Sequence, residues 1–325
     1  MNFEIPKETS TGRVMKVTLG ATSEQGGTRS HTVTIGGSTA LPFHFFEGEH
    51  PHRPLIAMEV FDKVPVKYPE YLKEYYRDVI DNPGAMAKKC VEEFGAELIS
   101  IRLEGTHPEK GNKSVEEAEE IVKQVLESVS VPIIITGHSH FEKINEVMKK
   151  ICEMTAGENC LINYVETDNY KTIAAACLAY KHTLVAQSPI DVNLAKQLNI
   201  LLTDMNFPPE KIVIDPLTGT LGYGLEYTYS IMERIRNDGL AGDKMLAFPM
   251  LINPGYESFR VKETRASEKD YPEWGNLEKR GAYWEIATSM SLLVAGAELL
   301  IMYHPQAVEV VKKKVQELHD SKKGT

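Results

Sequence analysis

Short apolar runs alternate with segments of helical period from residue 55 to the end of the chain. Each run is rich in Val, Ile and Leu, and a polar turn separates it from a stretch whose apolar residues recur every three to four positions. Runs without polar alternation are typical of strands buried on both faces, as in a parallel sheet covered by helices. The expected strands are 55–61, 97–103, 132–136, 160–166, 183–187, 211–215, 245–252 and 298–304.

Capping signals mark where the intervening helices begin. Ser114 and Glu117 have the spacing of a capping box, and Asn82–Pro83 and Ser188–Pro189 are typical of an N-cap followed by proline at the first helical position. Pro305 gives the same signal for the last helix, whose inner face is expected to carry Val308, Val311, Val315 and Leu318.

The number and spacing of these units predict the fold class. Eight strand–helix units over about 265 residues match the usual size of a (β/α)8 barrel, so the chain is expected to be an α/β protein of the TIM-barrel type. An open doubly wound sheet is the alternative, because alternation of strands and helices does not prove that the sheet closes.

Two segments depart from the repeating pattern. Residues 1–54 contain alternating runs at 14–20 and 31–37, which predict a β-hairpin and an extended arm. A plug over the amino-terminal end of the barrel is the favoured interpretation, and a partner-binding role is the alternative. The expected organisation is therefore an arm at 1–54, a barrel at 55–319 and a polar tail at 320–325. The second segment, 253–281, shows no clear period, and its aromatic residues favour an ordered, binding loop: Phe259, Tyr271 and Trp274.

Composition, charge and cysteine spacing indicate which partners, which cellular location and which metal sites to expect. The net charge of -10 argues against nucleic acid as a partner, since such binding depends on Lys and Arg. The N-terminus has no apolar signal region and Glu298 interrupts the most apolar late run, which predicts a cytoplasmic protein without a membrane span. The cysteines never fall into C-x-x-C spacing, which favours reduced core thiols over a zinc site or an iron–sulfur cluster: Cys90, Cys152, Cys160 and Cys177.

Chemistry in a (β/α)8 barrel collects at the carboxyl ends of the strands. His138 and His140 suggest a metal, but a hydrolytic zinc site needs further ligands that the neighbouring strand ends do not supply. Lys211 starts a strand and so lies at the wrong end for a Schiff base. The polar residues at the strand ends form no evident catalytic set: Glu59, Asp62, Glu104, His138, His140, Glu166, Asp168, Asn169, Gln187, Ser188, Asp215, Asn253 and His304.

A glycine-rich loop follows the strand at 211–215. Gly219, Gly222 and Gly224 have the order G-x-x-G-x-G, which is neither the dinucleotide fingerprint nor a P-loop. The loop has no Lys or Arg, and Glu226 in the first helical turn would oppose a phosphate. Glycines instead allow a broad ligand or another chain to approach the backbone, with apolar surface expected from Leu221, Tyr223, Tyr227 and Tyr229. A tight turn without a ligand is the alternative.

Three segments resemble a known family: "GGSTALPFHFFEGE" (36–49), "RPLIAMEVFD" (53–62) and "DPLTGTLGYGLEYTYSIMERIR" (215–236). They are similar to the small, or delta, subunit of the corrinoid iron–sulfur protein of the acetyl-CoA decarbonylase/synthase system. The resemblance extends over nearly the whole chain, and the third segment is the most specific.

The resemblance implies a barrel subunit of a heterodimer without stand-alone catalytic activity. The large partner subunit carries a [4Fe-4S] cluster and binds most of a cobamide. The heterodimer takes a methyl group from methyltetrahydrofolate through a separate methyltransferase and passes it to acetyl-CoA synthase. This chain is expected to hold no cluster, and it lacks the D-x-H-x-x-G motif that supplies a histidine to cobalt in other corrinoid proteins.

The expected cobamide contacts combine the glycine loop with polar strand ends. The loop residues come first, followed by residues placed at the strand ends: Thr218, Gly219, Thr220, Leu221, Gly222, Tyr223, Gly224, His138, Asp168, Asn169, Gln187 and Asn253. No catalytic residue and no metal ligand is assigned. The alternative function is a free-standing pterin-binding barrel methyltransferase, in which the pterin ring would be bound by Glu166, Asp168, Asn169, Asp215 and Asn253.

Overall fold

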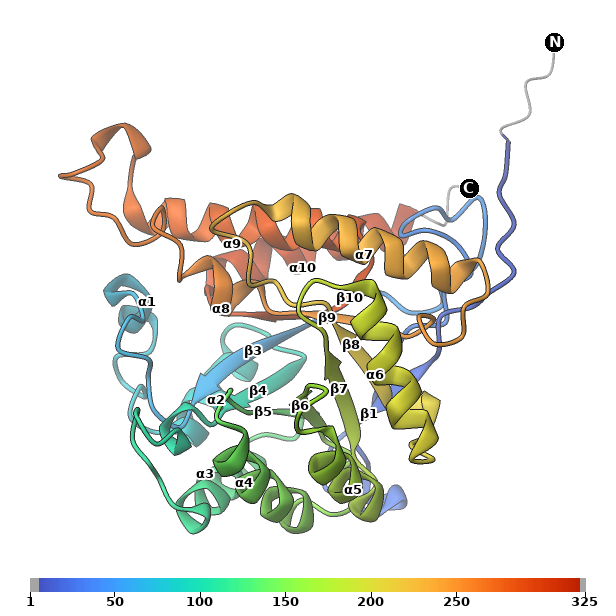
Figure 1. Ribbon diagram of the computed structural model, residues 1–325. Coiled ribbons are helices and arrows are strands. Elements are labelled where there is room, and N and C mark those ends of the chain that lie inside the picture. The colour runs from blue at the N-terminus through green and yellow to red at the C-terminus, as the bar shows by residue number, and fades with distance from the viewer. Residues whose placement is uncertain (1–5, 322–325) are drawn as a thin grey trace.

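The computed structural model describes residues 6–321, and the predicted barrel is confirmed (Figure 1). Eight parallel strands close in the order β10-β3-β4-β5-β6-β7-β8-β9. The first five residues of the predicted arm and residues 322–325 of the predicted tail lie outside the described part. The strands are β3 Leu55–Phe61, β4 Leu98–Arg102, β5 Ile133–Thr136, β6 Leu161–Val165, β7 Thr183–Gln187, β8 Ile212–Asp215, β9 Met250–Ile252 and β10 Ala297–Met302.

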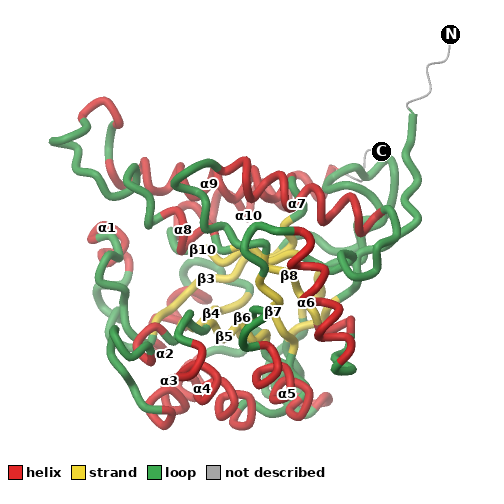
Figure 2. Tube along the Cα trace, viewed as in Figure 1, coloured by secondary structure: helices red, strands yellow, loops and turns green. Residues whose placement is uncertain are grey.

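Helices surround the barrel on its outer side, as Figure 2 shows in red around the yellow strands. Their apolar faces pack against the outer faces of the strands in one continuous core. The helices are α1 Glu70–Tyr75, α2 Pro83–Glu92, α3 Val115–Ser128, α4 Phe141–Met154, α5 Tyr170–Tyr180, α6 Val192–Asp204, α7 Leu225–Leu240, α8 Pro254–Ser258, α9 Leu277–Val294 and α10 Pro305–Asp320. None of the helices within residues 6–321 combines the length and the apolar character needed to cross a membrane.

Most of the predicted helix starts are confirmed. Ser114 and Glu117 form a capping box on α3, Asn82 caps α2, and Pro305 is the first residue of α10. The predicted cap at Ser188 is wrong, because Asp191 is the N-cap of α6 and accepts hydrogen bonds from the next backbone amides. Aspartate is as good a cap as serine, and it lies directly before the first apolar residue of the helix.

The N-terminal arm covers the amino-terminal end of the barrel. Its hairpin pairs β1 (Val17–Leu19) with β2 (Val33–Ile35) in antiparallel fashion. The apolar side chains of this hairpin pack against the inward-facing residues near the amino-terminal ends of the barrel strands. Buried Arg29 fixes the arm by an ion pair with Glu158 at 3.0 Å and a hydrogen bond to the carbonyl of Val129 at 2.6 Å. The arm therefore closes the end opposite the carboxyl ends of the strands.

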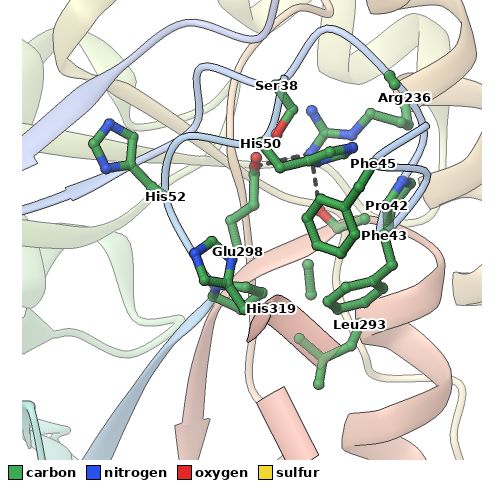
Figure 3. Close-up of a pocket in the computed structure, with 14 residues that line it drawn as sticks. Ser38, Pro42, Phe43, Phe45, His50, His52, Arg236, Leu293, Glu298 and His319 are labelled. Carbon is green, nitrogen blue, oxygen red and sulfur yellow. Dashed lines mark hydrogen bonds and ion pairs between the residues drawn. The ribbon is translucent and has the colours of Figure 1, made fainter. Parts of the chain in front are cut away.

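The arm also reaches residues far along the chain. The amide of Gly12 donates to the carbonyl of Leu240, and the amide of Met15 donates to that of Ala247, both at 2.7 Å. Residues 38–54 of the arm then cover a hollow of about 30 Å³ (Figure 3). Inside it Arg236 pairs with Glu298 at 2.8 Å. This hollow is a packing seam, since its volume is far below the roughly 300–1,000 Å³ of ligand pockets.

The segment between β9 and α9 is ordered, as its aromatic residues predict. It contains α8 and the short helix η4 (Pro272–Trp274), and it projects from the barrel at the upper left of Figure 1. Phe259 is 3% exposed and stacks on Tyr303 with ring centroids 5.9 Å apart. The predicted strand at 245–252 begins later, at Met250, because a turn at 244–246 and irregular backbone after it interrupt the apolar run.

Candidate functional site

A polar cavity of about 240 Å³ opens at the carboxyl ends of the strands, where barrels of this fold carry their sites. Side chains from β4 to β8, from the segments that follow these strands, and from α8 contribute to its wall. The residues that line it are Arg102, Glu104, Lys110, Thr136, His138, Ser139, Asn163, Tyr164, Gln187, Asp215, Leu217, Thr218, Asn253, Tyr256, Glu257 and Arg260. We call this cavity the barrel mouth.

A buried ion pair forms one side of the barrel mouth. The Nε of Arg102 donates to the carboxylate of Glu59 at 2.7 Å, and the hydroxyl of Tyr303 donates to the same carboxylate at 2.6 Å. Ser100 donates to its other oxygen at 3.0 Å. Burial alone would lower the pKa of the Arg102 guanidinium, but the neighbouring Glu59 carboxylate raises it, and the net shift is upward, so Arg102 carries its positive charge.

Acceptor groups gather on another part of the wall, within β6 and at the end of β8. The carboxylate of Asp215 accepts from Gln187 at 2.7 Å and from the amide of Leu217 at 2.8 Å. Burial raises the pKa of Asp215 to about 6. Asn163 is 2% exposed and donates to Thr136, while its Oδ1 has no hydrogen-bond partner among the described residues. A buried acceptor without a donor is rare and is a natural contact for a ligand N–H group.

Helix α8 places a flat stack over the mouth. Asn253 caps this helix by accepting from the amide of Tyr256 at 3.0 Å. The Tyr256 ring lies between two guanidinium groups, with Arg102 at 4.2 Å and Arg260 at 4.7 Å from its centroid. Arg260 also pairs with Glu257 at 3.1 Å, and burial raises the pKa of Glu257. Cation–π contacts of this kind hold the ring in a fixed orientation.

His138, which lines the mouth, is a neutral side chain. Burial lowers the pKa of His138 to about 4, and its ring contacts those of His107 and His140 at 4.9 and 6.5 Å. The Nδ1 of His138 accepts from the amide of His140, and Nε2 lies 3.0 Å from the hydroxyl of Thr106. Within residues 6–321 no group of three or more His, Cys, Asp or Glu side chains is arranged to hold a metal ion.

The structure brings only some of the predicted contact residues to the barrel mouth. His138, Gln187, Thr218 and Asn253 line it. Asp168 is exposed and does not line the mouth. Buried Asn169, which also lies outside the lining, instead accepts from the amide of Glu166 at 2.8 Å.

The glycine loop lies beside the mouth, and only part of its predicted surface faces solvent. Tyr223 is 90% exposed and Tyr227 is 54% exposed, whereas Leu221 is buried, so its predicted place on the loop surface is wrong. Among the loop glycines only Gly224 has a positive φ, of 152°. Packing within the chain does not require a glycine at Gly222, since an added Cβ would meet only the Val261 side chain, at an ordinary contact distance of 3.6 Å.

Hydrogen bonds within the loop hold it in one shape. The amide of Tyr223 donates to the carbonyl of Thr220 at 2.7 Å, and the hydroxyl of Thr228 donates to the carbonyl of Leu217 at 3.1 Å. Buried Thr218 accepts from the amide of Asn253 at 3.4 Å, which connects the loop to the start of α8. The exposed Tyr223 ring is thus carried on a backbone that is fixed on both sides.

Several mouth residues are absent from the sequence-based set. Arg102 lies at the end of an apolar run, and the sequence signal that could have identified it is a charged residue in an otherwise buried strand. Asn163 gives the same signal in β6. Tyr256 and Arg260 lie in the segment without clear period, where nothing in the sequence predicts the helix that turns Tyr256 over the mouth.

Comparison with known proteins places the chain in one family of sequences. A family model described as CO dehydrogenase/acetyl-CoA synthase delta subunit matches residues 16–315. The delta subunit of the acetyl-CoA decarbonylase/synthase complex of Archaeoglobus fulgidus is 40% identical over 318 residues, which are 96% of this chain and 70% of that protein. The corresponding subunit of Methanocaldococcus jannaschii is 33% identical over 314 residues, or 96% of this chain and 76% of that protein.

Solved structures support the fold at low sequence identity. A dihydropteroate synthase of Xanthomonas albilineans, in complex with indole-2-carboxylic acid and 6-chloroguanine, has a TM-score of 0.57 and 17% identity, and the match covers 84% of this chain and 96% of that one. The same enzyme in complex with 7,8-dihydropteroate gives a TM-score of 0.54 at 17% identity and the same coverage. These matches establish a shared barrel architecture.

Proposed function

Because this chain belongs to the CO dehydrogenase/acetyl-CoA synthase delta-subunit family, and so is a subunit of a multi-subunit complex, we propose that it is the non-catalytic half of a corrinoid methyl carrier. In this proposal the glycine loop and the rim of the barrel mouth cover part of a cobamide. The exposed Tyr223 ring, held between Gly222 and Gly224 on a fixed loop, is the observation that carries the proposal.

The loop residues fit a broad, flat ligand. Tyr223 offers an exposed aromatic ring, and Tyr227 in the first turn of α7 is a second exposed ring. Gly222 is exposed, and the surrounding chain would leave room for a side chain at this position. Because glycine has no side chain, the backbone here stays open to a ligand that approaches from outside. Thr218 and Thr220 accept hydrogen bonds that fix the loop backbone. The exposed groups would therefore keep their positions when a ligand binds.

The remaining parts of the proposed carrier come from partners. The large corrinoid iron–sulfur subunit would bind most of the cobamide and carry the [4Fe-4S] cluster, and this chain would hold no cluster. The methyl donor would be methyltetrahydrofolate, acting through a separate methyltransferase, and the acceptor would be acetyl-CoA synthase, all in the cytoplasm. Cobalt supplies the methyl-carrying chemistry when the cobamide is bound. This chain's residues would orient the macrocycle and exclude water from one side of it.

Co-expression with the large subunit tests this proposal. Gly222→Val fills the open approach and Tyr223→Ala removes the exposed ring, so each variant should lower the corrinoid absorbance per heterodimer at least several-fold. Ile200→Ala on α6, 39% exposed, is the control and should leave it unchanged. An intact heterodimer with full corrinoid content in both loop variants would contradict the proposal. Cobalamin-dependent turnover by this chain alone would contradict its non-catalytic role.

A second candidate function, a pterin-binding methyltransferase, is favoured by the acceptor groups in the barrel mouth. Asp215 and the unpaired Oδ1 of Asn163 both line a cavity of about 240 Å³, and a pterin ring carries amino and lactam N–H donors. Several solved barrels of similar architecture are dihydropteroate synthases. Of the residues predicted to bind a pterin, Asp215 and Asn253 line the mouth, whereas Glu166, Asp168 and Asn169 do not.

Calorimetric titration with methyltetrahydrofolate separates the two candidates. The carrier subunit alone should show no saturable heat, whereas a pterin-binding enzyme should bind at micromolar concentration. Asp215→Asn should then weaken this binding at least tenfold, because an amide cannot accept at both of its polar atoms. Saturable binding that is insensitive to Asp215→Asn would place a pterin outside the barrel mouth.

A further inference from the structure

A second groove is formed by residues of the projecting segment and of α9, and it shares no residue with the barrel mouth. Figure 1 shows the two elements that form it. Its volume is about 370 Å³, and it is lined by Trp274, Gly275, Asn276, Lys279, Arg280, Tyr283, Trp284 and Ala287. The chain has two tryptophans, Trp274 and Trp284, and both are in this lining. We call it the tryptophan groove. Neither the glycine loop nor any mouth residue contributes to it.

The tryptophan groove holds hydrogen-bond donors that the fold leaves unused. Arg280 donates through Nη2 to the carbonyl of Ala266, but its Nε and Nη1 are buried and have no partner among the described residues. The Nε1 of Trp284 is also buried and unpaired within residues 6–321. A buried donor without a partner loses the hydrogen bonds that it makes to water in the unfolded chain, so an acceptor that reaches these groups is strongly favoured.

No carboxylate of the described chain supplies that acceptor. Neither Lys279 nor Arg280 has a carboxylate of residues 6–321 within ion-pair distance. Two acidic residues nearby in the sequence have other partners: Glu278 accepts from Tyr75 at 2.8 Å, and Glu268 accepts from the amide of Leu277 at 2.7 Å. A chain of net charge -10 thus presents two cations here without a counter-charge.

Aromatic rings complete the groove. Tyr271 and Trp274 stack with centroids 4.1 Å apart, Lys262 lies 4.4 Å above Tyr271, and Arg280 lies 5.4 Å from Trp274. Tyr283 on α9 is 66% exposed. Half-buried Trp and Arg side chains beside an exposed Tyr have the residue composition that dominates binding energy at protein interfaces.

We propose that the tryptophan groove docks another subunit of the complex through an Asp or Glu side chain on an apolar segment of that subunit. The carboxylate accepts from Arg280 and Trp284, lies beside Lys279, and brings apolar neighbours onto Tyr283. The Trp274 ring covers the guanidinium, so the entering carboxylate moves this ring, which lies on the projecting segment rather than on the barrel. This docking rests on membership of the complex and is independent of where a corrinoid binds.

Zero-length cross-linking of the assembled complex tests the chemistry of the occupant. A carbodiimide joins a lysine amine to a carboxylate in direct contact with it, so digestion and mass spectrometry should show Lys279 joined to an Asp or Glu of a partner subunit. Lys279→Arg keeps the charge and should abolish this product. Lys149, exposed on α4, is the control lysine and should give no such product. Coupling of Lys279 only within its own chain, or to a second copy of it, would overturn the proposal.

Affinity measurements test the contribution of the rings. Tyr283→Ala should raise the dissociation constant of this chain for the rest of the complex at least tenfold, and because Tyr283 is mostly exposed, the variant should fold normally. Val294→Ala is the matched control, since Val294 is 51% exposed on the same helix face, about 16 Å further along α9. Its affinity should change less than twofold.

Labelling this chain alone with 5-fluorotryptophan gives one ¹⁹F signal for each of its two tryptophans. Both signals should shift on assembly, even when Gly222→Val has removed the corrinoid. Unchanged signals together with an unchanged affinity for Tyr283→Ala would show that the tryptophan groove is not a docking surface. Loss of corrinoid with intact docking would count against the proposed function only.

Discussion

Replacing Glu59 by Gln tests the ion pair beside the barrel mouth. Glu59 is 1% exposed, and its carboxylate accepts from Arg102, Tyr303 and Ser100 at 2.6–3.0 Å. Gln has nearly the same shape, but it removes the negative charge and turns one acceptor oxygen into a donor. The Arg102 guanidinium, 6% exposed, would be left without a counter-charge in the protein interior.

The expected loss of stability is large. Breaking a buried ion pair by removing one member costs about 3–5 kcal/mol. A chain of 325 residues has an unfolding entropy of about 0.7 kcal/mol per kelvin near 60 °C, so the Tm of Glu59→Gln should fall by roughly 4–7 °C. Thermal denaturation followed by circular dichroism measures this shift against the wild-type chain at one pH and salt concentration.

The double variant Glu59→Met/Arg102→Met is the control. It removes both charges and replaces the pair by apolar side chains of similar length, an exchange that is often neutral for stability. Its Tm should therefore lie above that of Glu59→Gln. A Tm of the single variant within about 1 °C of wild type, or a double variant no more stable than the single one, would refute the assignment of a tightly coupled buried pair.

Three further outcomes are expected. Gly224→Ala should lower the free energy of unfolding by about 1–3 kcal/mol because the φ of Gly224 is 152°, whereas Gly222→Ala should leave it within about 0.5 kcal/mol; urea denaturation distinguishes them. Burial lowers the pKa of His182 from 6.5 to about 4 in the folded protein. Between these two pH values His182 binds a proton in the unfolded chain but not in the folded one, so stability is lost as the pH falls from 6.5 to 4. His182→Gln should reduce that loss by roughly 3 kcal/mol in urea titrations at the two pH values. Burial raises the pKa of Cys90 and Cys160 to about 12, so neither thiol should react with a disulfide reagent at pH 8 until the protein is unfolded.

The barrel could be predicted from the sequence because its strands are apolar throughout. Runs such as 55–61 and 183–187 coincide with β3 and β7 at both ends. The prediction failed where two local signals compete, as at Ser188, or where turns interrupt an apolar run, as before Met250. Local capping preferences differ by too little to decide such cases without the tertiary contacts.

The candidate site was harder to predict because it depends on which strand-end side chains share one cavity. Gln187 and Asn253 could be placed from their positions alone. Asp168 has the same kind of position, yet it is exposed and lies outside the cavity lining. Arg102 and Tyr256 meet across 154 positions of the chain, a contact that no local pattern predicts.

The contacts of the N-terminal arm have a consequence for the order in which the chain can fold. Gly12 and Met15 are made early by the ribosome, but their partners, Leu240 and Ala247, are made more than two hundred residues later. This stretch of the arm therefore cannot reach its partners until most of the chain has been synthesised. Contacts of such long sequence separation are slow to form. Gly12 and Met15 are thus synthesised long before they can reach their final place.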